Sequence, residues 1–223
     1  NEPRDFLVRA SLSSSPAQDA VLEDAMRLAP EGFSAIELYS CFPCVPKMAR
    51  RALGLGENVE PTVTGGLTFF GAPLSNYMLH AACAMTRRMR AGDGYGLLYG
   101  QGEFVTKHHA LVLSREARRG ALAPADNAQA IADSRRAPAP EIVAPSAGDA
   151  VVEASTVIYQ RDGSVMHGAV VLRDAQGRRT AAKVAAQDET TLGALTRADV
   201  SPVGIEGCIA ADASGAAVWR VRG

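Results

Sequence analysis

The fold is signalled most clearly between Thr64 and Pro73, where the chain reads Thr-Gly-Gly-Leu-Thr-Phe-Phe-Gly-Ala-Pro. This glycine segment runs directly into a helix-like segment from Leu74 to Arg90. Ser75 or Asn76 is placed to cap the first turn of that helix. Apolar residues then recur along one side of the second segment, at Leu74, Met78, Ala82, Met85 and Met89. We therefore expect a glycine-rich loop that leads into an amphipathic helix.

Segments on either side of this pair alternate between strand and helix patterns. Ser15, Pro16 and Gln18 are typical of a helix start, with serine at the N-cap and proline at the first helical position. A second, shorter helix is expected over residues 46–53. Strand-like segments fall at residues 6–12, 33–39, 95–99 and 109–113. Strands that alternate with helices favour an α/β fold, with a largely parallel sheet and helices on both faces.

The pattern changes after residue 116. Residues 117–148 are rich in Ala, Pro, Arg and Asp, which predicts a linker that includes one short helix at 125–136. Strand patterns resume beyond it, at residues 151–159, 165–172, 179–185, 203–210 and 216–221. A short helix at 190–195 separates the third of these strands from the fourth. Five strands in this arrangement suggest a small OB-like barrel over 149–223, following a first domain over 1–116.

Composition excludes several classes of function. The chain has 223 residues, of which 47% are hydrophobic, and a net charge of −1, so a packed core is expected and polyanions are not attracted. No apolar run approaches the ~20 residues of a membrane span, and no signal peptide is visible. The four cysteines are too few for a disulfide scaffold. We expect a cytoplasmic protein that binds neither membrane nor nucleic acid, because the barrel lacks a basic groove and an aromatic stacking platform.

Three segments, in this order, resemble the C-terminal half of a thiolase subunit: Glu37–Pro43, Gly65–Pro73 and Gly96–Gly102. Sterol-carrier-type thiolases and the thiolase-like proteins related to them are the nearest subgroup, and the OB-like tail resembles the extra C-terminal domain of such proteins. The resemblance implies a five-stranded mixed sheet with helices on both faces. It also implies an acetyl-CoA acetyltransferase homologue of lipid metabolism, with acyl-CoA as ligand and no resident cofactor. An N-terminal thiolase half would be the partner, and a homo-oligomer is compatible with the family.

The same resemblance nominates site residues. Cys41 matches a cysteine that the subgroup uses, and it stands where a strand meets a helix N-terminus, which favours a thiolate. His80 belongs to an Asn-Tyr-x-x-His pattern, and Lys107 with His108 resembles a pair in the thiolase-like group. Ligand contacts are expected from the backbone and side chains of Gly65, Gly66, Gly71 and Asn76. We predict no metal site.

The sequence also departs from the family. Ala72 stands where thiolases have the histidine that binds the thioester oxygen, and Leu98 falls near the position of their acid/base cysteine. Two hypotheses therefore stay open. One is an acyltransferase that acts on acyl-CoA thioesters, and the other is a non-catalytic protein that binds acyl-CoA or assembles with partners through a degenerate site.

Structural explanations compete at each of these residues. A free cysteine is often a small core residue, a lone helical histidine is commonly structural, and Lys107 and His108 fit a solvated strand entry. Cys41 and Cys44 also form a Cys-x-x-Cys motif between a strand and a helix, which is the context of a dithiol redox site. Zinc is disfavoured because no second ligand pair has metal spacing. Alternation along the strand sends His108 and His109 to opposite faces.

Overall fold

The computed structural model describes residues 1–39, 41–116 and 127–222. The chain divides into two compact units, each of which takes a piece from near the N-terminus. The first unit comprises residues 1–6 and 13–137, and the second comprises residues 7–12 and 138–223. Residue 40 and the part of the predicted linker at 117–126 lie outside the described residues.

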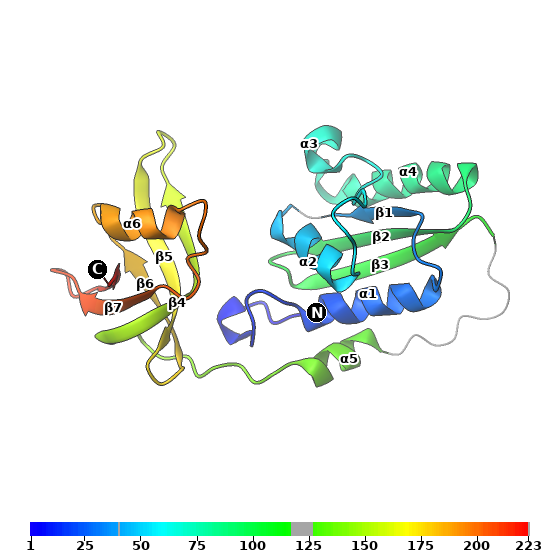
Figure 1. The fold of residues 1–223 in the computed structure, drawn as a ribbon. Coiled ribbons are helices and arrows are strands. Elements are labelled where there is room, and N and C mark those ends of the chain that lie inside the picture. The colour runs from blue at the N-terminus through cyan, green and yellow to red at the C-terminus, as the bar shows by residue number, and fades with distance from the viewer. Residues whose placement is uncertain (40, 117–126, 223) are drawn as a thin grey trace. The chain divides into compact units, whose positions relative to one another are not determined.

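The first unit is an α/β layer structure (Figure 1). Its sheet has the order β1-β2-β3, with β1 and β2 parallel and β2 and β3 antiparallel, so the described sheet is mixed. The strands are β1 Ala35–Leu38, β2 Tyr95–Gly102 and β3 Lys107–Ser114. The helices are α1 Pro16–Leu28, α2 Cys44–Ala52, α3 Gly66–Phe70, η2 Leu74–Asn76, α4 Tyr77–Ala91 and α5 Ala128–Arg135.

Both faces of this sheet are buried under helices. Leu97 and Tyr99 of β2 point to the face covered by α1 and α2, where they pack against Leu22 and Val45. Leu98, between them, points to the opposite face and packs under α4. This alternation explains why β2 reads as a continuous apolar run, since a strand covered on both sides needs no polar face. The expected α/β class, with helices on both sides, is confirmed.

The start of α1 is fixed by local chemistry, as its sequence predicts. Ser15 has an extended backbone, and its side-chain oxygen accepts a hydrogen bond from the Gln18 N–H. Pro16 fills the first helical position, where no N–H is needed. Leu22 and Ala25 then lie on the buried stripe of the helix.

Two expectations about this unit are wrong. Residues 6–12 do not form a strand: Phe6–Val8 is a 3₁₀ helix, η1, and the backbone carbonyls of Leu7 and Arg9 accept hydrogen bonds from the Arg179 guanidinium instead of joining a β-ladder. The sheet accordingly has three strands within the described residues, not five. The glycine segment is also more ordered than a plain loop, because it contains α3.

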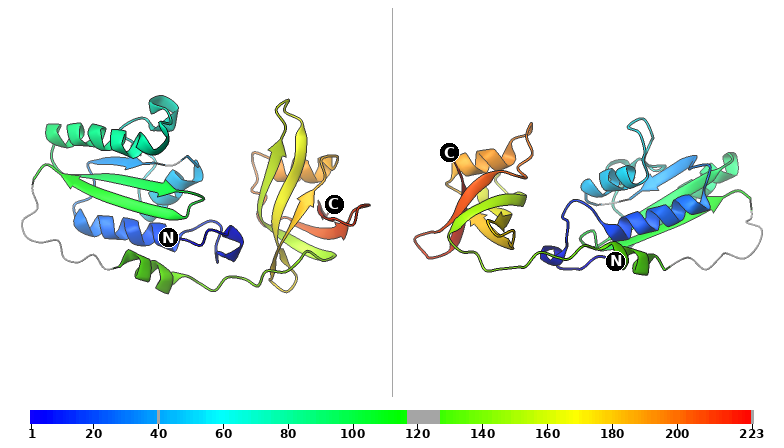
Figure 2. Two further views of the ribbon diagram at one scale, coloured as in Figure 1. Left: turned by 180° about the vertical axis from the view of Figure 1, so that it is seen from behind. Right: turned by 60° about the horizontal axis from the view of Figure 1, so that its bottom comes forward.

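The second unit is a closed barrel with strand order β4-β5-β6-β8-β7, completed by pairing of β4 with β7. Five strands and a helix between the third and fourth are confirmed. The elements are β4 Gly148–Tyr159, β5 Val165–Asp174, β6 Arg179–Val184, α6 Glu189–Thr196, β7 Glu206–Ala211 and β8 Ala217–Val221. Figure 2 shows the barrel from two further sides, with α6 packed against its strands.

Trp219 is the centre of the barrel core. Its ring is fully buried, and its indole N–H donates to the Ala150 carbonyl at 3.2 Å. Gly207 makes room for it, since a Cβ at that position would lie 2.2 Å from the Arg220 carbonyl and 2.5 Å from the Trp219 ring. The barrel therefore closes around one large side chain that depends on a neighbouring glycine.

Candidate functional site

The carboxyl ends of the two parallel strands place a thiol beside an amide. Cys41 follows the end of β1, and Gln101 is the penultimate residue of β2. The Gln101 Nε2 atom donates a hydrogen bond to the Cys41 Sγ atom at 3.8 Å. Ligands of open α/β sheets bind at the carboxyl edge of the strands, so Cys41 stands where this fold class puts its chemistry.

Tyr39 completes what we call the sulfur site, which is Tyr39, Cys41 and Gln101. Burial raises the pKa of the Tyr39 phenol, and the neighbouring Cys41 sulfur adds to the shift through charge and a hydrogen bond. Cys41 itself is exposed. The thiol is therefore accessible while two hydrogen-bonding side chains lie against it.

A buried carboxylate binds residues 62–64, which lead into the glycine segment. Glu37, on β1, is completely buried, and its oxygens accept hydrogen bonds from the Thr62 hydroxyl and the backbone N–H groups of Val63 and Thr64. The Tyr77 hydroxyl donates to the same carboxylate at 2.7 Å. Burial raises the pKa of Tyr77 to about 12, with the Glu37 charge contributing. This network, the Glu37 lock, attaches the glycine segment to both β1 and α4.

The glycines nominated for ligand contact all have positive φ, at 89° for Gly65, 73° for Gly66 and 84° for Gly71. Side chains rarely adopt this backbone region, so glycine is required for the shape of the segment. The N–H groups of Gly65 and Gly66 donate to the Thr62 hydroxyl. Asn76 is exposed and caps α4 by position, with no side-chain cap bond. Ala72 is exposed as well.

Aromatic rings connect the sulfur site to His80. Tyr39 lies against Tyr77, with ring centroids 4.7 Å apart, and Tyr77 meets the edge of Phe70 at 5.9 Å. Phe70 in turn contacts the exposed His80 ring at 5.5 Å in an edge-on arrangement. Cys41, the glycine segment and His80 are thus joined by a continuous row of side chains.

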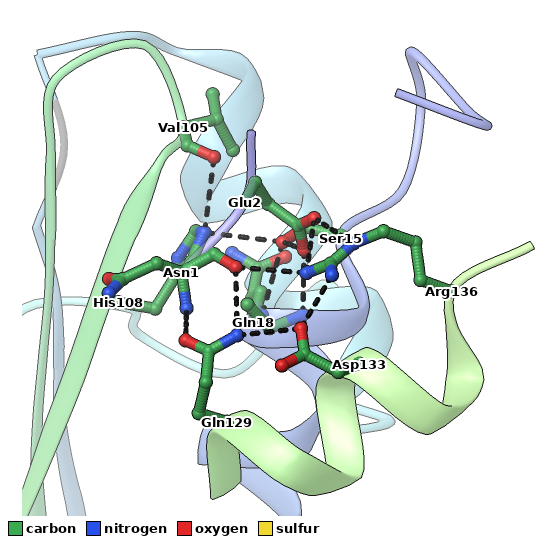
Figure 3. A network of polar contacts seen from close by, with 10 residues as sticks. Asn1, Glu2, Ser15, Gln18, Val105, His108, Gln129, Asp133 and Arg136 are labelled. Carbon is green, nitrogen blue, oxygen red and sulfur yellow. Dashed lines mark hydrogen bonds and ion pairs between the residues drawn. The ribbon is translucent and has the colours of Figure 1, made fainter. Parts of the chain in front are cut away.

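His108 has a different environment, shown in Figure 3. Its ring is buried, with Nδ1 at 2.7 Å from the Tyr99 hydroxyl and Nε2 at 3.2 Å from the Ser15 hydroxyl. Ser15 donates its proton to Glu2, and Tyr99 accepts from the Gln18 amide. The Ser15 oxygen must therefore accept from His108, and the Tyr99 hydroxyl must donate to it. Both bonds form when His108 carries its proton on Nε2 and accepts at Nδ1.

The same network binds the N-terminus to α5. Arg136 donates to the Glu2 carboxylate and to the Asn1 carbonyl, which also accepts from Gln129 (Figure 3). Burial disfavours the charged form of Glu2, but hydrogen bonds from Ala17 and Ser15 and the nearby Arg136 outweigh it and lower the pKa of Glu2. In this setting His108 supports the packing of α1, α5 and the N-terminus.

The remaining residues singled out from the sequence are Lys107, His108 and Leu98. Lys107 is exposed and forms an ion pair with Glu103 at 2.9 Å. His108 lies directly opposite Gln101, the neighbour of Cys41, in the β2–β3 ladder. Leu98 is buried in the core under α4.

Sequence reasoning missed Glu37, Tyr39 and Gln101 as site residues. All three lie in the segments that carry the family resemblance, so the quoted motifs contained them. What the motifs did not reveal is that the Glu37 carboxylate faces the loop at Thr62–Gly66, or that the Gln101 side chain reaches Cys41. Those contacts depend on strand register and on alternation between faces.

A cavity of about 550 Å³ lies elsewhere in the first unit, between the N-terminal end of β1, residues 59–63 and α4. Arg87 and Arg88 line it, and none of the nominated site residues does. In the described part of the chain, no cluster of His, Cys, Asp or Glu has a metal-binding arrangement. Nor does any described helix combine the length and apolarity needed to cross a bilayer.

Comparison with known proteins defines the class. Residues 128–214 match the family described as the thiolase-like protein type 1 additional C-terminal domain. Over 99% of its length the chain is similar to the crystal structure of a monomeric SCP2-thiolase like protein type 1 from Mycobacterium smegmatis, with a TM-score of 0.81 and 26% sequence identity. No curated protein matches.

Together the two matches support a thiolase-like family with an additional C-terminal domain for this chain. The chain covers 48% of the matched structure, and so spans about half the length of that protein. The resemblance predicted from the three motifs and the tail is confirmed.

Proposed function

We propose that this chain is the C-terminal half of a thiolase-like acyl-CoA acetyltransferase homologue, and that acyl-CoA thioesters bind at the sulfur site. The observation that carries the proposal is the exposed Cys41 thiol, held between Tyr39 and Gln101 at the carboxyl edge of the parallel strands. Hydrogen-bond donors beside a thiol stabilise both a thiolate and the oxygen of a bound thioester. The proposed setting is the cytoplasm, where permanent disulfides are rare.

The glycine segment supports binding next to that thiol. Because Gly65, Gly66 and Gly71 carry no side chains, a ligand can approach the backbone closely there. The Glu37 lock keeps this surface fixed relative to β1, so it is formed before a ligand arrives. In this proposal Asn76 and His80 border the ligand, and Lys107 and His108 act from the start of β3, His108 as a residue that positions the Gln101 strand.

A second function is favoured by two specific residues. Ala72 has no ring nitrogen with which to bind a thioester oxygen, and Leu98 carries no acid or base. A protein that binds acyl-CoA without turning it over, or that assembles with partners, fits these two positions. Binding is common to both functions, and turnover separates them.

A partner half is supported by the surface around the glycine segment. Phe69 and Leu74 have exposed fractions of 85% and 91%, and Phe70 and Leu79 are also exposed. Clustered exposed apolar side chains mark interaction surfaces. We propose that an N-terminal thiolase half covers them, in the same polypeptide or in a partner subunit, and that the barrel is OB-like, as its strand order β4-β5-β6-β8-β7 supports.

Alkylation protection tests the binding site. The rate of iodoacetamide labelling at Cys41 and at Cys83 would be followed by peptide mass spectrometry, with no ligand, with free CoA and with acetyl-CoA. We expect acyl-CoA to slow labelling at Cys41 severalfold and to leave Cys83, exposed on the outer side of α4, unchanged. Equal rates at Cys41 with and without saturating ligand would refute the site. Loss of thioester absorbance during incubation would establish turnover and exclude the non-catalytic alternative.

A further inference from the structure

Cys44 is a second exposed thiol close to Cys41, and the sulfur site does not use it. It is the first residue of α2, three positions after Cys41, and both thiols are free and exposed. The backbone between them is turned: Pro43 has helical dihedrals, with φ −58° and ψ −22°, and the Phe42 carbonyl accepts from the Val45 N–H at 3.0 Å.

A turn of this kind brings two cysteines close to the spacing that a disulfide needs. Residues three apart on a helical turn have Cβ atoms about 5 to 6 Å apart before side chains adjust. A disulfide needs Cα atoms about 4.4 to 6.8 Å apart, and its Cβ atoms come to about 3.8 Å. Since Cys41 precedes the helix and is not held by its hydrogen bonds, a small rotation there closes the remaining gap.

Charge around Cys44 favours thiol exchange. The first turn of α2 carries no acidic side chain, whereas Arg50 and Arg51 lie in its last turn and Lys47 is one turn from Cys44. A nine-residue helix directs the positive end of its dipole to its N-terminus, where Cys44 stands. This positive surrounding attracts anionic reagents to the exposed Cys44 thiol.

We propose that Cys41 and Cys44 form a reversible intramolecular disulfide, with a low-molecular-weight disulfide such as oxidised glutathione as the oxidant. One protein thiolate attacks a glutathione sulfur, which gives a mixed disulfide and releases one glutathione thiolate. The second protein thiolate attacks the protein sulfur of that mixed disulfide, which forms the Cys41–Cys44 bond and releases the second glutathione. Two thiols are oxidised, one disulfide is reduced, and the two thiol protons end on the two glutathione products.

Oxidation would have a direct effect on the sulfur site. In the disulfide the Cys41 sulfur can neither ionise nor attack, and it moves from the Gln101 amide toward α2. Bond formation itself does not depend on acyl-CoA binding, so this proposal and the proposed function can fail separately.

The test uses a Cys83→Ser, Cys208→Ser background, which leaves two thiols in the chain. After treatment with oxidised glutathione and removal of the reagent, thiols are counted with iodoacetamide, and intact mass is measured. We expect two labelled thiols before oxidation and none after it, with a mass lower by two hydrogens, no glutathione adduct, and recovery by dithiothreitol.

Adding Cys44→Ser to that background provides the control, since Cys41 alone should retain a glutathione adduct. Adding Cys41→Ser instead tests Cys44 in the same way. Two stable glutathione adducts on the double-thiol protein, or disulfide-linked dimers, would overturn the proposal. Unchanged circular dichroism of each variant establishes that thiol loss, and not unfolding, is being measured.

Discussion

Arg179 and Glu153 form a two-point ion pair inside the barrel unit. The Arg179 Nε atom lies 2.8 Å from one Glu153 carboxylate oxygen, Nη2 contacts the other oxygen, and the Arg179 side chain is completely buried. The remaining nitrogen of the fork, Nη1, donates to the carbonyls of Leu7 and Arg9. One guanidinium therefore attaches residues 7–12 to strand β6.

Replacing Arg179 with Met should release that segment. Breaking one side of a buried ion pair costs up to about 3 to 5 kcal/mol, and Arg173, which also pairs with Glu153, should reduce that loss. We expect a lower thermal midpoint and faster trypsin cleavage after Arg9. Arg178→Ala is the matched control, since its ion pair with Asp174 is partly exposed and its loss should change the thermal midpoint little. Equal cleavage rates in the two variants would contradict the attachment of residues 7–12 by Arg179.

The same pair predicts sensitivity to acid. Burial disfavours ionised Glu153, but hydrogen bonds from Arg179 and Arg173 outweigh it and lower its pKa below the ordinary 4.5. A carboxylate with a lowered folded pKa stabilises the protein above the unfolded pKa, and this stabilisation is lost as pH falls from about 4.5 through the folded value. Glu153→Gln should be less stable at neutral pH and should show a flatter fall in thermal midpoint below that pH.

Alkaline unfolding should depend on Tyr77. Its pKa is raised to about 12, against 10 for an ordinary phenol, mainly by burial. The protonated phenol therefore stabilises the fold fully below pH 10, and this contribution is lost as pH rises from 10 toward 12. Tyr77→Phe should weaken the Glu37 lock at neutral pH by about 1 kcal/mol and reduce the alkaline slope. Tyr159→Phe, at an exposed position, is the control. In a pH series of thermal melts it should change neither the stability at neutral pH nor the alkaline slope.

Two glycine-to-alanine changes in the barrel unit should have opposite signs. At Gly207 the new methyl group would lie 2.2 Å from the Arg220 carbonyl, so we expect a loss of about 1 to 3 kcal/mol or more from overpacking beside Trp219. At Gly193, inside α6, nothing lies within 4 Å of the new methyl, and alanine should stabilise by about 0.5 to 1 kcal/mol. Chemical denaturation of both variants checks the pair, and a stable Gly207→Ala protein would contradict the packing described.

Gln101→Leu should make the Cys41 thiol less reactive. The amide donates to the sulfur, and the loss of one such bond is worth about 1 kcal/mol, or roughly fivefold in a rate that depends on it. Iodoacetamide labelling of Cys41 should slow by that factor, while Cys83 in the same sample provides the internal reference. An unchanged labelling rate at Cys41 would show that the Gln101 amide does not influence the thiol.

Local features of the sequence predicted local structure well. Neighbouring residues determine the Ser15–Pro16 start of α1, and a short period of apolar residues marks the five strands of the tail. The sequence alone therefore predicts both. Residues 6–12 could not be read in this way. Their strand-like composition is overridden by Arg179, which is 172 positions from Leu7.

The site was predictable only in part, for the same reason. Cys41 and the glycine segment were recognisable as motifs, but the Glu37 lock joins residues 25 to 40 positions apart. Gln101 reaches Cys41 across 60 positions, through the pairing of β1 with β2. Contacts of this kind follow from tertiary structure, and no pattern in a single sequence reports them.

Because the barrel unit includes residues 7–12, which lie between two pieces of the other unit, neither unit is encoded by one continuous stretch. A gene fragment starting at Pro138 would produce strands without the backbone carbonyls that occupy the Arg179 guanidinium. Transplanting this barrel onto another scaffold would therefore require a short upstream insert as well, and recombination at a single junction would separate the arginine from the peptide it holds.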